Sequence, residues 1–285
     1  MNLNDWLKRA KNEGWAIGQF NVSNLEALHA VVFAGTKLHA PLIIGVSEGE
    51  REFFGIPEVV AIVKALKDKT GLPIFLNADH TKSFEKVKEA VDAGFDSVHF
   101  DGSALSYEEN VHQTKRAVEY SKSQNVDISV EGELGYLRGT SRVQEEVEIL
   151  PEDFTDPEQA ADFVLRTGID RLAPVFGNIH GIVTNAKEKL DLERLRAISA
   201  KTNAYLVLHG GSGVDFKDIR QAIRLGVVKI NVNTDLRIAY RKALEKVLSD
   251  MPDETTPYRL LSPVVEKIQK VVEEKIKIFG SDGKA

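Results

Sequence analysis

Short apolar runs alternate with longer amphipathic segments along most of the chain. The runs are rich in β-branched and aromatic residues and fall at 15–22, 41–48, 73–80, 97–103, 127–135, 171–177, 205–211 and 227–233. The segments between them, among them 57–70, 84–94, 107–123 and 216–226, carry apolar residues near the i, i+3, i+4, i+7 spacing of a helix. Strands that alternate with helices in this way predict an α/β fold, a parallel (β/α)8 TIM barrel.

An open, doubly wound sheet is the competing arrangement, and it carries a glycine-rich turn after its first strand. The segment at that place here, FNVSNLEAL (20–28), contains no glycine. The barrel is therefore favoured. We expect residues 1–285 to form one barrel domain, without an internal boundary or a short repeat.

Two segments exceed a minimal barrel. Residues 136–156, after the fifth strand, are numerous and charged enough to form a mobile lid. The chain beyond about residue 251 predicts extra C-terminal helices, most clearly over 262–280. The apolar stripe of this stretch is expected to pack on the barrel or on a second subunit.

Composition excludes several classes of partner and site. A net charge of −6 and a pI of about 5.7 argue against a nucleic-acid or anionic-membrane partner. The chain has no cysteine, which excludes disulfides and thiolate metal sites. The N-terminus lacks the apolar core of a signal peptide, and no apolar stretch reaches the roughly 20 residues of a membrane span. A soluble cytoplasmic protein is therefore expected.

Three of the seven histidines follow predicted strands. His80 ends the third strand, His180 follows the sixth and His209 ends the seventh. In a barrel of this kind the carboxyl ends of the strands form the active face, so these side chains should meet there. Three neutral imidazoles bind zinc or a similar ion and leave one coordination position open for a substrate.

Other polar residues fall at the same end of the barrel. Carboxylates stand at Asp79, Asp101, Glu131 and Glu133, and the eighth strand ends in Asn231, Asn233 and Thr234. Asp101 could instead cap the next helix. Glu131 and Glu133 share one face of their strand and need a cation, which a metal would supply. His99 lies between two apolar residues and is expected to be a packed barrel residue.

A glycine-rich run, HGGSG (209–213), follows the seventh strand and precedes a helix that is expected to begin near Asp215. Glycine permits close backbone approach, and a helix N-terminus offers free N–H groups to an anion. Together with the polar end of the eighth strand, this is the usual place of a phosphate site in such barrels.

These motifs together resemble a known family. The Asp-His pair in NADH (77–80), VHFDGS (98–103), VEGELG (130–135), GNIHG (177–181), LHGGSG (208–213) and KINVNT (229–234) occur in the order found in one group of enzymes. The chain resembles the class II, metal-dependent ketose-bisphosphate aldolases, which cleave fructose or tagatose 1,6-bisphosphate. The resemblance runs through almost the whole chain.

The resemblance implies a role for each matching residue. His80, His180 and His209 would hold a catalytic zinc or another divalent ion, with Glu133 and Asp101 beside it. Asp79 would be the general base for the C4 hydroxyl, and Asn231 would contact the metal-stabilised enediolate. The remaining matches would bind substrate or its phosphates: Asn21, Ser47, Gly181, Gly210, Gly211, Ser212, Asn233 and Thr234. Family members often also bind a monovalent cation, Na+ or K+, and a homodimer or homotetramer is implied.

Two positions depart from the family pattern. Members usually carry an acidic pair a few residues after ELG, whose glutamate moves the proton at C1, but Ser141 and Arg142 stand there. Glu145 or Glu146 could substitute, or neither. A Pro-Arg pair near the C-terminal helices normally lends an arginine to the other subunit's distal phosphate. Here the segment reads Thr-Pro-Tyr-Arg, which displaces Arg259 by one residue.

Three hypotheses about the function follow. The first is a zinc-dependent aldolase that cleaves fructose 1,6-bisphosphate to dihydroxyacetone phosphate and glyceraldehyde 3-phosphate, with tagatose 1,6-bisphosphate or another ketose phosphate as the alternative substrate. The second is a Schiff-base aldolase that uses Lys229, for which a buried ion pair is the plainer explanation. The third is a non-catalytic sugar-phosphate binding protein that has lost turnover with the altered loop.

Overall fold

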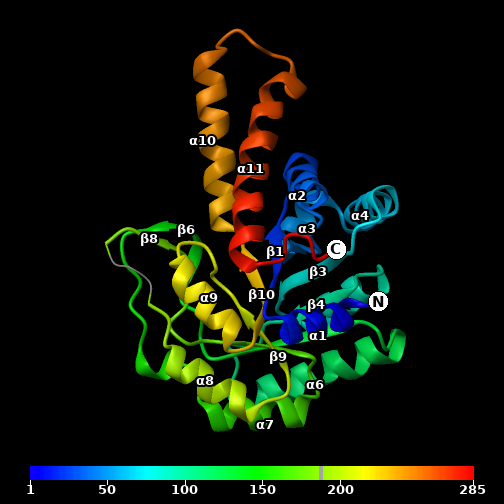
Figure 1. The fold of residues 1–285 in the computed structure, drawn as a ribbon. Coiled ribbons are helices and arrows are strands. Elements are labelled where there is room, and N and C mark those ends of the chain that lie inside the picture. Colours follow the sequence, from blue (N-terminus) through cyan, green and yellow to red (C-terminus); the bar gives the residue numbers. More distant parts are fainter. Residues whose placement is uncertain (186–188) are drawn as a thin grey trace.

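Eight parallel strands close into a barrel in a computed structural model that describes residues 1–185 and 189–285 (Figure 1). The order around the barrel is β1-β10-β9-β7-β5-β4-β3-β2. The strands are β1 Ile17–Asn21, β2 Leu42–Val46, β3 Ile74–Thr81, β4 Ser97–Phe100, β5 Ser129–Leu134, β7 Arg171–Pro174, β9 Tyr205–Leu208 and β10 Val227–Val232. The predicted TIM barrel is confirmed. Seven of the eight strands lie within the predicted apolar runs, and β3 extends one residue beyond its run, to Thr81.

Helices cover the outside of the barrel and connect its strands. Their apolar stripes pack against strands that are buried on both faces, as parallel strands between helices must be. The connecting helices are α2 Leu25–Leu38, α3 Glu48–Phe54, α4 Ile56–Thr70, α5 Phe84–Asp92, α6 Tyr107–Gln124, α7 Pro157–Thr167, α8 Leu192–Lys201 and α9 Phe216–Arg224.

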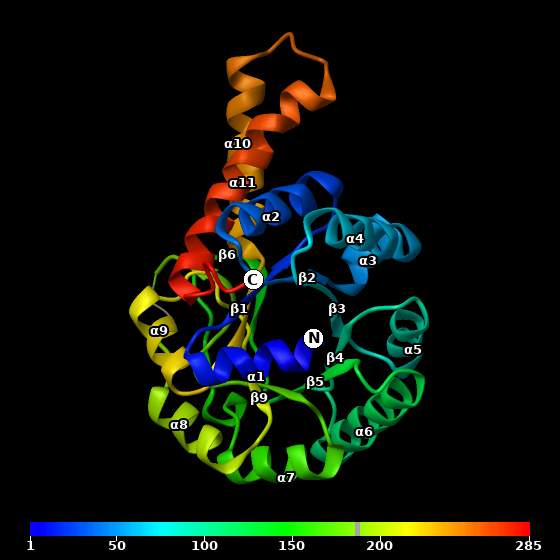
Figure 2. The ribbon, with the colours of Figure 1, turned by 45° about the vertical axis from the view of Figure 1, so that its right-hand side comes forward.

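The N-terminal helix α1 (Leu3–Glu13) lies across the end of the barrel where the strands begin (Figure 2). Asn2 caps this helix, and its buried face, which includes Trp6 and Leu7, packs on Ile43 and Phe75 from inside the barrel. This end is therefore filled with apolar side chains. The interior of the barrel is thus closed at this end, and its polar side chains are reached from the opposite end, where the strands finish.

The segment after β5 is more regular than the expected lid. It contains β6 (Gly139–Gln144) and a 3-10 turn at Pro151–Asp153, and β6 pairs in parallel with β8 (His180–Val183). The side chain of Gln144 donates to the carbonyl oxygen of His180 at 2.8 Å. A two-stranded sheet thus stands beside the mouth of the barrel and fixes the chain on both sides of His180.

The C-terminal segment forms an arm that projects from the barrel. Helices α10 (Thr234–Asp250) and α11 (Pro257–Phe279) run side by side away from the strands and return (Figure 1). The apolar face of α11, which includes Val264, Ile268 and Val272, packs on α2 and α10. The predicted helix and its packing on the barrel are confirmed. No helix among the described residues is long and apolar enough to cross a membrane.

Candidate active site

An irregularity at the end of β3 brings two consecutive residues into one site. Neighbouring side chains on a strand normally point to opposite faces. The pairing of β3 with β4 shifts register between Ala78 and Thr81, and His80 adopts a left-handed backbone conformation with φ of 43°. Such a bulge redirects side chains locally. Asp79 and His80 consequently both line the same cavity.

Three histidines and a carboxylate form a compact group at the mouth of the barrel. One ligand atom from each of His80, His99, Glu133 and His209 lies within 4.8 Å of all the others. The Nε2 atom of His80 is 3.2 Å from Nδ1 of His209, and Nε2 of His99 is 3.2 Å from Oε2 of Glu133. Ligands about 2.0–2.1 Å from a tetrahedral zinc are roughly 3.4 Å apart, so these separations suit such an ion.

Unpaired polar atoms in this group also favour a cation. Nε2 of His99 and Oε2 of Glu133 are buried without a hydrogen-bond partner of good geometry among the described residues. A buried carboxylate oxygen without a partner carries a large desolvation cost. A metal ion between the imidazoles and the carboxylate would satisfy these atoms.

His180 lies beside this group without joining its closest set of atoms. Its ring centroid is 4.8 Å from that of His80 and 6.4 Å from that of His209. His99, expected to be a packed barrel residue, is fully buried, but it packs against His80 and His209 inside the group. The sequence analysis therefore did not predict His99 as a site residue. Its position could have indicated this role, because His99 lies two residues before Asp101 on the strand next to β3.

Carboxylates orient two of the histidines from behind. Asp101 lies 2.8 Å from Nδ1 of His80, and Glu131 lies 2.7 Å from Nε2 of His209. The free nitrogens of these rings, Nε2 of His80 and Nδ1 of His209, therefore face each other. A carboxylate behind a ligating histidine fixes its tautomer and increases its basicity. Asp101 does not cap the next helix, because Ser106 has that role.

The cation that Glu131 needs comes from the protein itself. Its carboxylate accepts from Lys229 at 2.8 Å and lies 3.0 Å from Nε of Arg171, and all three residues are fully buried. Burial alone would raise the pKa of Glu131, but the two cations hold it well below its usual value. The polar residues at this end of the barrel thus form two layers, with Lys229 in the lower layer and outside the cavity.

Asp79 is buried and held by two amides. The Nδ2 atom of Asn21 donates to Oδ2 at 2.9 Å, and that of Asn231 donates to Oδ1 at 3.3 Å. Burial alone would raise the pKa of Asp79. The charge of His80 and the neighbouring ring of His99 outweigh it and keep the pKa well below its usual value. The carboxylate is therefore ionised at neutral pH and can accept a proton from a bound hydroxyl.

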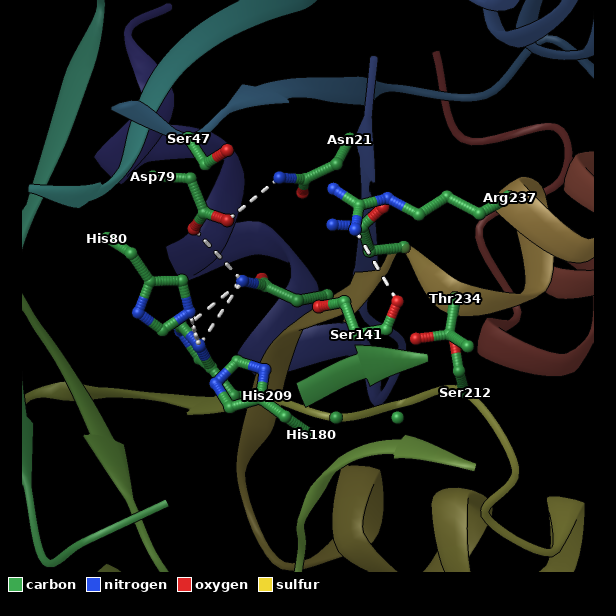
Figure 3. Close-up of a pocket in the computed structure, with 14 residues that line it drawn as sticks. Asn21, Ser47, Asp79, His80, Ser141, His180, His209, Ser212, Thr234 and Arg237 are labelled. Carbon is green, nitrogen blue, oxygen red and sulfur yellow. Dashed lines mark hydrogen bonds between the residues drawn. The ribbon is translucent and has the colours of Figure 1, made fainter. Parts of the chain in front are cut away.

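These groups line a cavity of about 100 Å³ at the carboxyl end of the barrel (Figure 3). Metal candidates lie on one side of it and polar backbone and hydroxyl groups on the other. The lining residues are Asn21, Ser47, Asp79, His80, Ser141, His180, Gly181, His209, Gly210, Ser212, Asn231, Asn233, Thr234 and Arg237.

An anion would find its donors at the start of α10. Asn233 precedes this helix without a side-chain cap. One N–H group of the first turn, that of Asp235, already donates to the hydroxyl of Ser212 at 3.2 Å. The helix near Asp215, α9, is different because the carboxylate of Asp215 itself caps it. The phosphate donors expected at α9 are therefore available at α10 instead. Gly210 has φ of 71°, and a Cβ there would overlap the carbonyl oxygen of Ile179.

Some predicted residues lie outside the cavity. Gly211 is behind its wall, where its N–H donates to the carbonyl oxygen of Asn231, and Arg259 is at the tip of the arm, paired with Glu254. Glu145 and Glu146 are exposed and do not line the cavity.

The cavity is also lined by Ser141 and by Arg237. The sequence analysis did not predict Arg237 as a site residue. The sequence could have indicated a place in the site for Arg237, because it lies one helical turn after Thr234.

Comparisons with known proteins identify the family of the chain. Residues 1–284 match the family described as fructose-bisphosphate aldolase class-II. The chain is 40% identical over 290 residues to the fructose-bisphosphate aldolase of Staphylococcus epidermidis, covering 100% of this chain and 99% of that protein. It is 39% identical to the probable fructose-bisphosphate aldolase of Bacillus subtilis, with the same coverage.

Solved structures give the same result. The YdjI aldolase of Escherichia coli K12 superposes with a TM-score of 0.84 at 33% identity, covering 100% of this chain and 98% of that one. A putative fructose-1,6-biphosphate aldolase of Coccidioides immitis has a TM-score of 0.84 at 30% identity, covering 99% and 97%. Both the sequence and the fold place this chain in the class II fructose-bisphosphate aldolase family, an enzyme family of lyases.

Proposed function

We propose that this protein cleaves fructose 1,6-bisphosphate reversibly to dihydroxyacetone phosphate and glyceraldehyde 3-phosphate, with a zinc ion as cofactor. The observation that carries the proposal is one cavity that joins three elements. It contains an ionised, buried carboxylate at Asp79, a histidine group with the spacing of a metal site, and the uncapped start of α10. These are a proton acceptor, a Lewis-acid site and an anion site.

His80, His180 and His209 are the proposed zinc ligands. His80 and His209 already face each other at 3.2 Å, and His180 has its ring beside that of His80. Glu133 and His99 lie on the other side of this pair, and Asp101 and Glu131 orient it from behind. Zinc, when bound, would neutralise the negative charge that develops on the substrate oxygens during cleavage.

Asp79 is the proposed general base. It takes the proton of the C4 hydroxyl as the C3–C4 bond breaks, which leaves the aldehyde on one fragment and an enediolate on the other. Asn21 and Asn231 hold its two oxygens and prevent the carboxylate from rotating away. In condensation the same group returns the proton to the aldehyde oxygen. The amide of Asn231, which also lies 3.3 Å from Nε2 of His209, is placed to contact the enediolate.

The phosphate of the dihydroxyacetone half is proposed to bind at Gly181, Gly210, Ser212, Asn233 and Thr234. The backbone at Gly210 lies so close to the carbonyl oxygen of Ile179 that a Cβ would not fit there. The start of α10 presents N–H groups with a favourable dipole. Binding energy from this remote group fixes the reacting carbons near Asp79 and the metal. A monovalent cation, Na+ or K+, is proposed to accompany this phosphate.

Two other activities are less well supported. Lys229 is fully buried in ion pairs and does not line the cavity, so its amine is poorly placed to form a Schiff base. A non-catalytic binding protein would explain the lack of a loop carboxylate among the described residues around the cavity. However, it would leave the ionised Asp79 without a purpose. Tagatose 1,6-bisphosphate, which differs in configuration at C4, is the alternative substrate.

The test is an assay of the purified protein with fructose and tagatose 1,6-bisphosphates, after chelation and again after zinc is restored. Cleavage that disappears with chelation and returns with zinc is the expected result, and the ratio of the two rates identifies the sugar. If the zinc-loaded protein binds either sugar without cleaving it, the binding-protein alternative is correct. Reductive trapping of a substrate–protein adduct would instead support Lys229.

A further inference from the structure

Two buried amides lie beneath the active-site cavity, and the proposed mechanism does not use either of them. Gln19 on β1 and Asn77 on β3 are fully buried inside the barrel, and neither lines the cavity. Burial of an amide without hydrogen bonds costs free energy that an apolar side chain of similar size would not lose. The hydrogen-bond partners of these two amides therefore indicate what they do.

The two amides belong to one chain of hydrogen bonds that leads to Asp79. Nη2 of Arg171 donates to Oδ1 of Asn77 at 3.2 Å, and Nδ2 of Asn77 donates to Oε1 of Gln19 at 2.9 Å. Nε2 of Gln19 donates to Oδ1 of Asn21 at 3.1 Å, and Nδ2 of Asn21 donates to Oδ2 of Asp79 at 2.9 Å. Figure 3 shows the last of these contacts, with the amide of Asn21 turned toward Asp79. Side chains of β1, β3 and β7 are thus joined across the interior of the barrel.

Both ends of this chain fix its direction. A guanidinium can only donate hydrogen bonds, and an ionised carboxylate can only accept them. Each amide between the two must therefore turn its oxygen toward Arg171 and its nitrogen toward Asp79. An amide turned the other way would place two oxygens or two N–H groups opposite each other at a buried contact, which costs free energy. The orientation of Asn21 consequently depends on Gln19 and Asn77 as well as on Asp79.

Gln19 holds the amide that in turn holds Asp79. Nδ2 of Asn21 donates to Asp79 and also to Oε2 of Glu50, at 2.9 Å in each case, so both of its N–H groups are used. Among the described residues, the only donor to Oδ1 of Asn21 is Gln19. Without this donor a buried oxygen would be unpaired. The amide would then turn toward another donor, and its contact with Asp79 would be lost.

A glycine between β1 and β3 leaves room for this chain. Gly45 on β2 pairs with Asn21 on one side and with Asn77 on the other. A Cβ at Gly45 would lie 2.6 Å from Oδ1 of Asn21 and 2.6 Å from Nε2 of Gln19, the two atoms that form their hydrogen bond. Any side chain at this position would push the two amides apart, so their contact depends on glycine.

We propose that Gln19 is a positioning residue for the cleavage reaction: by donating to Asn21, it keeps the Asp79 carboxylate in the orientation that accepts the substrate proton. This inference rests on the proposed function and deepens it. Gln19 itself does not contact the substrate, because it lies beneath the residues that line the cavity. Proton transfer requires a base within hydrogen-bond reach and in good alignment, so a carboxylate that rotates freely would react slowly.

The test is a double-mutant cycle that combines Gln19→Met with Asn21→Ala. Methionine has a similar length to glutamine but lacks the amide. In Gln19→Met, kcat for the bisphosphate that the wild type cleaves should fall roughly 10- to 100-fold, the range of a misplaced catalytic group. KM and the zinc dissociation constant should change less than about 3-fold, because Gln19 contacts neither substrate nor metal. In the Asn21→Ala background the same substitution should change kcat less than about 2-fold, since its effect passes through Asn21.

Two further variants separate positioning from general damage to the core. Ser129 is fully buried where β5 begins, and its hydroxyl donates to Oδ1 of Asn4 at 2.6 Å. Ser129→Ala is the control for loss of a buried hydrogen bond: it should lower the urea midpoint, as Gln19→Met does, but leave kcat within about 2-fold of wild type. Gly45→Ala retains both amides and separates them, so it should lower kcat as Gln19→Met does.

The outcomes distinguish this inference from the proposed function. Wild-type kcat in Gln19→Met, or effects of Gln19→Met and Asn21→Ala that multiply in the double variant, would overturn the inference and leave the proposed function intact. If Gln19→Met does not fold, Gly45→Ala decides, and a wild-type kcat in that variant would overturn the inference. A wild-type protein that cleaves neither fructose nor tagatose 1,6-bisphosphate would overturn the proposed function and this inference with it.

Discussion

Glu131 and His209 are joined by a short contact, with Oε1 of Glu131 2.7 Å from Nε2 of His209. The same carboxylate pairs with Lys229 and Arg171 at the centre of the barrel. One buried residue therefore both orients a proposed metal ligand and neutralises two buried cations. The lower barrel core and the proposed metal site are physically linked through it.

Replacement of Glu131 should consequently damage stability and metal binding together. In Glu131→Gln the buried cations lose their counter-charge, which should reduce the free energy of unfolding by about 3–5 kcal/mol. Zinc affinity should fall roughly 10- to 100-fold because His209 loses its orienting carboxylate. Chemical denaturation and a zinc competition assay measure the two effects. Glu133→Gln is the control, since Glu133 contacts neither Lys229 nor Arg171 and should affect zinc far more than stability. Unchanged stability of Glu131→Gln would contradict this account.

Asp79→Ala should separate chemistry from metal binding. The variant is expected to retain zinc, because Asp79 lies outside the compact ligand group, while kcat for cleavage falls roughly 100- to 10,000-fold through loss of the general base. Metal content per chain and steady-state cleavage of fructose 1,6-bisphosphate give the two readouts. Near-normal turnover in this variant would remove Asp79 from its assigned role.

Alanine substitutions of the four histidines should distinguish ligands from neighbours. His80→Ala and His209→Ala should lose both tight zinc binding and activity. His180→Ala should do the same if its ring completes the coordination, whereas His99→Ala should retain zinc more tightly than His180→Ala. Zinc dissociation constants of the four variants are the measurement. The reverse order for His180 and His99 would assign the third position to His99.

Zinc affinity should increase with pH through the neutral range. Burial alone would lower the pKa of His80, but the charge of Asp79 and the hydrogen bond to Asp101 raise it above its ordinary value of 6.5 in the metal-free protein. Burial lowers the pKa of His180 and of His209, so these rings are already neutral at lower pH. Below the pKa of His80, zinc must therefore displace a proton, and the dissociation constant should decrease as pH rises toward that pKa and then level off. Titrations with a competing chelator from pH 6 to about 8.5 test this, and an affinity independent of pH would contradict it.

The barrel could be predicted from the sequence because its signal is local. Apolar runs of strand length alternate with segments of helical period, and each pattern is readable within a short window. The parallel topology then places every strand end at one face, which is why the sequence alone predicts that His80, His180 and His209 lie together. The order of the motifs along the chain indicated the family, because each motif is also a short, local stretch of sequence.

Side-chain direction and long-range packing required the tertiary structure. His99 reads as an apolar-flanked strand residue, and only the pairing of β4 with its neighbours shows that its ring meets His80 and His209. The start of α10, and not that of α9, is open to an anion because Asp215 caps the latter. Glu145, Glu146 and Arg259 carry suitable chemistry, but the pairing of β6 with β8 and the course of the arm hold them away from the cavity.

The sequence by itself thus determined the architecture and the residue types at the mouth of the barrel, since both depend on periodicity and strand order. Only the tertiary structure decided which of these side chains share a cavity and which are neutralised below it. That division follows from the contacts of Glu131 and Asn21 with residues far away in the chain. Such contacts depend on how close the folded backbone brings distant segments, and no local pattern encodes that distance.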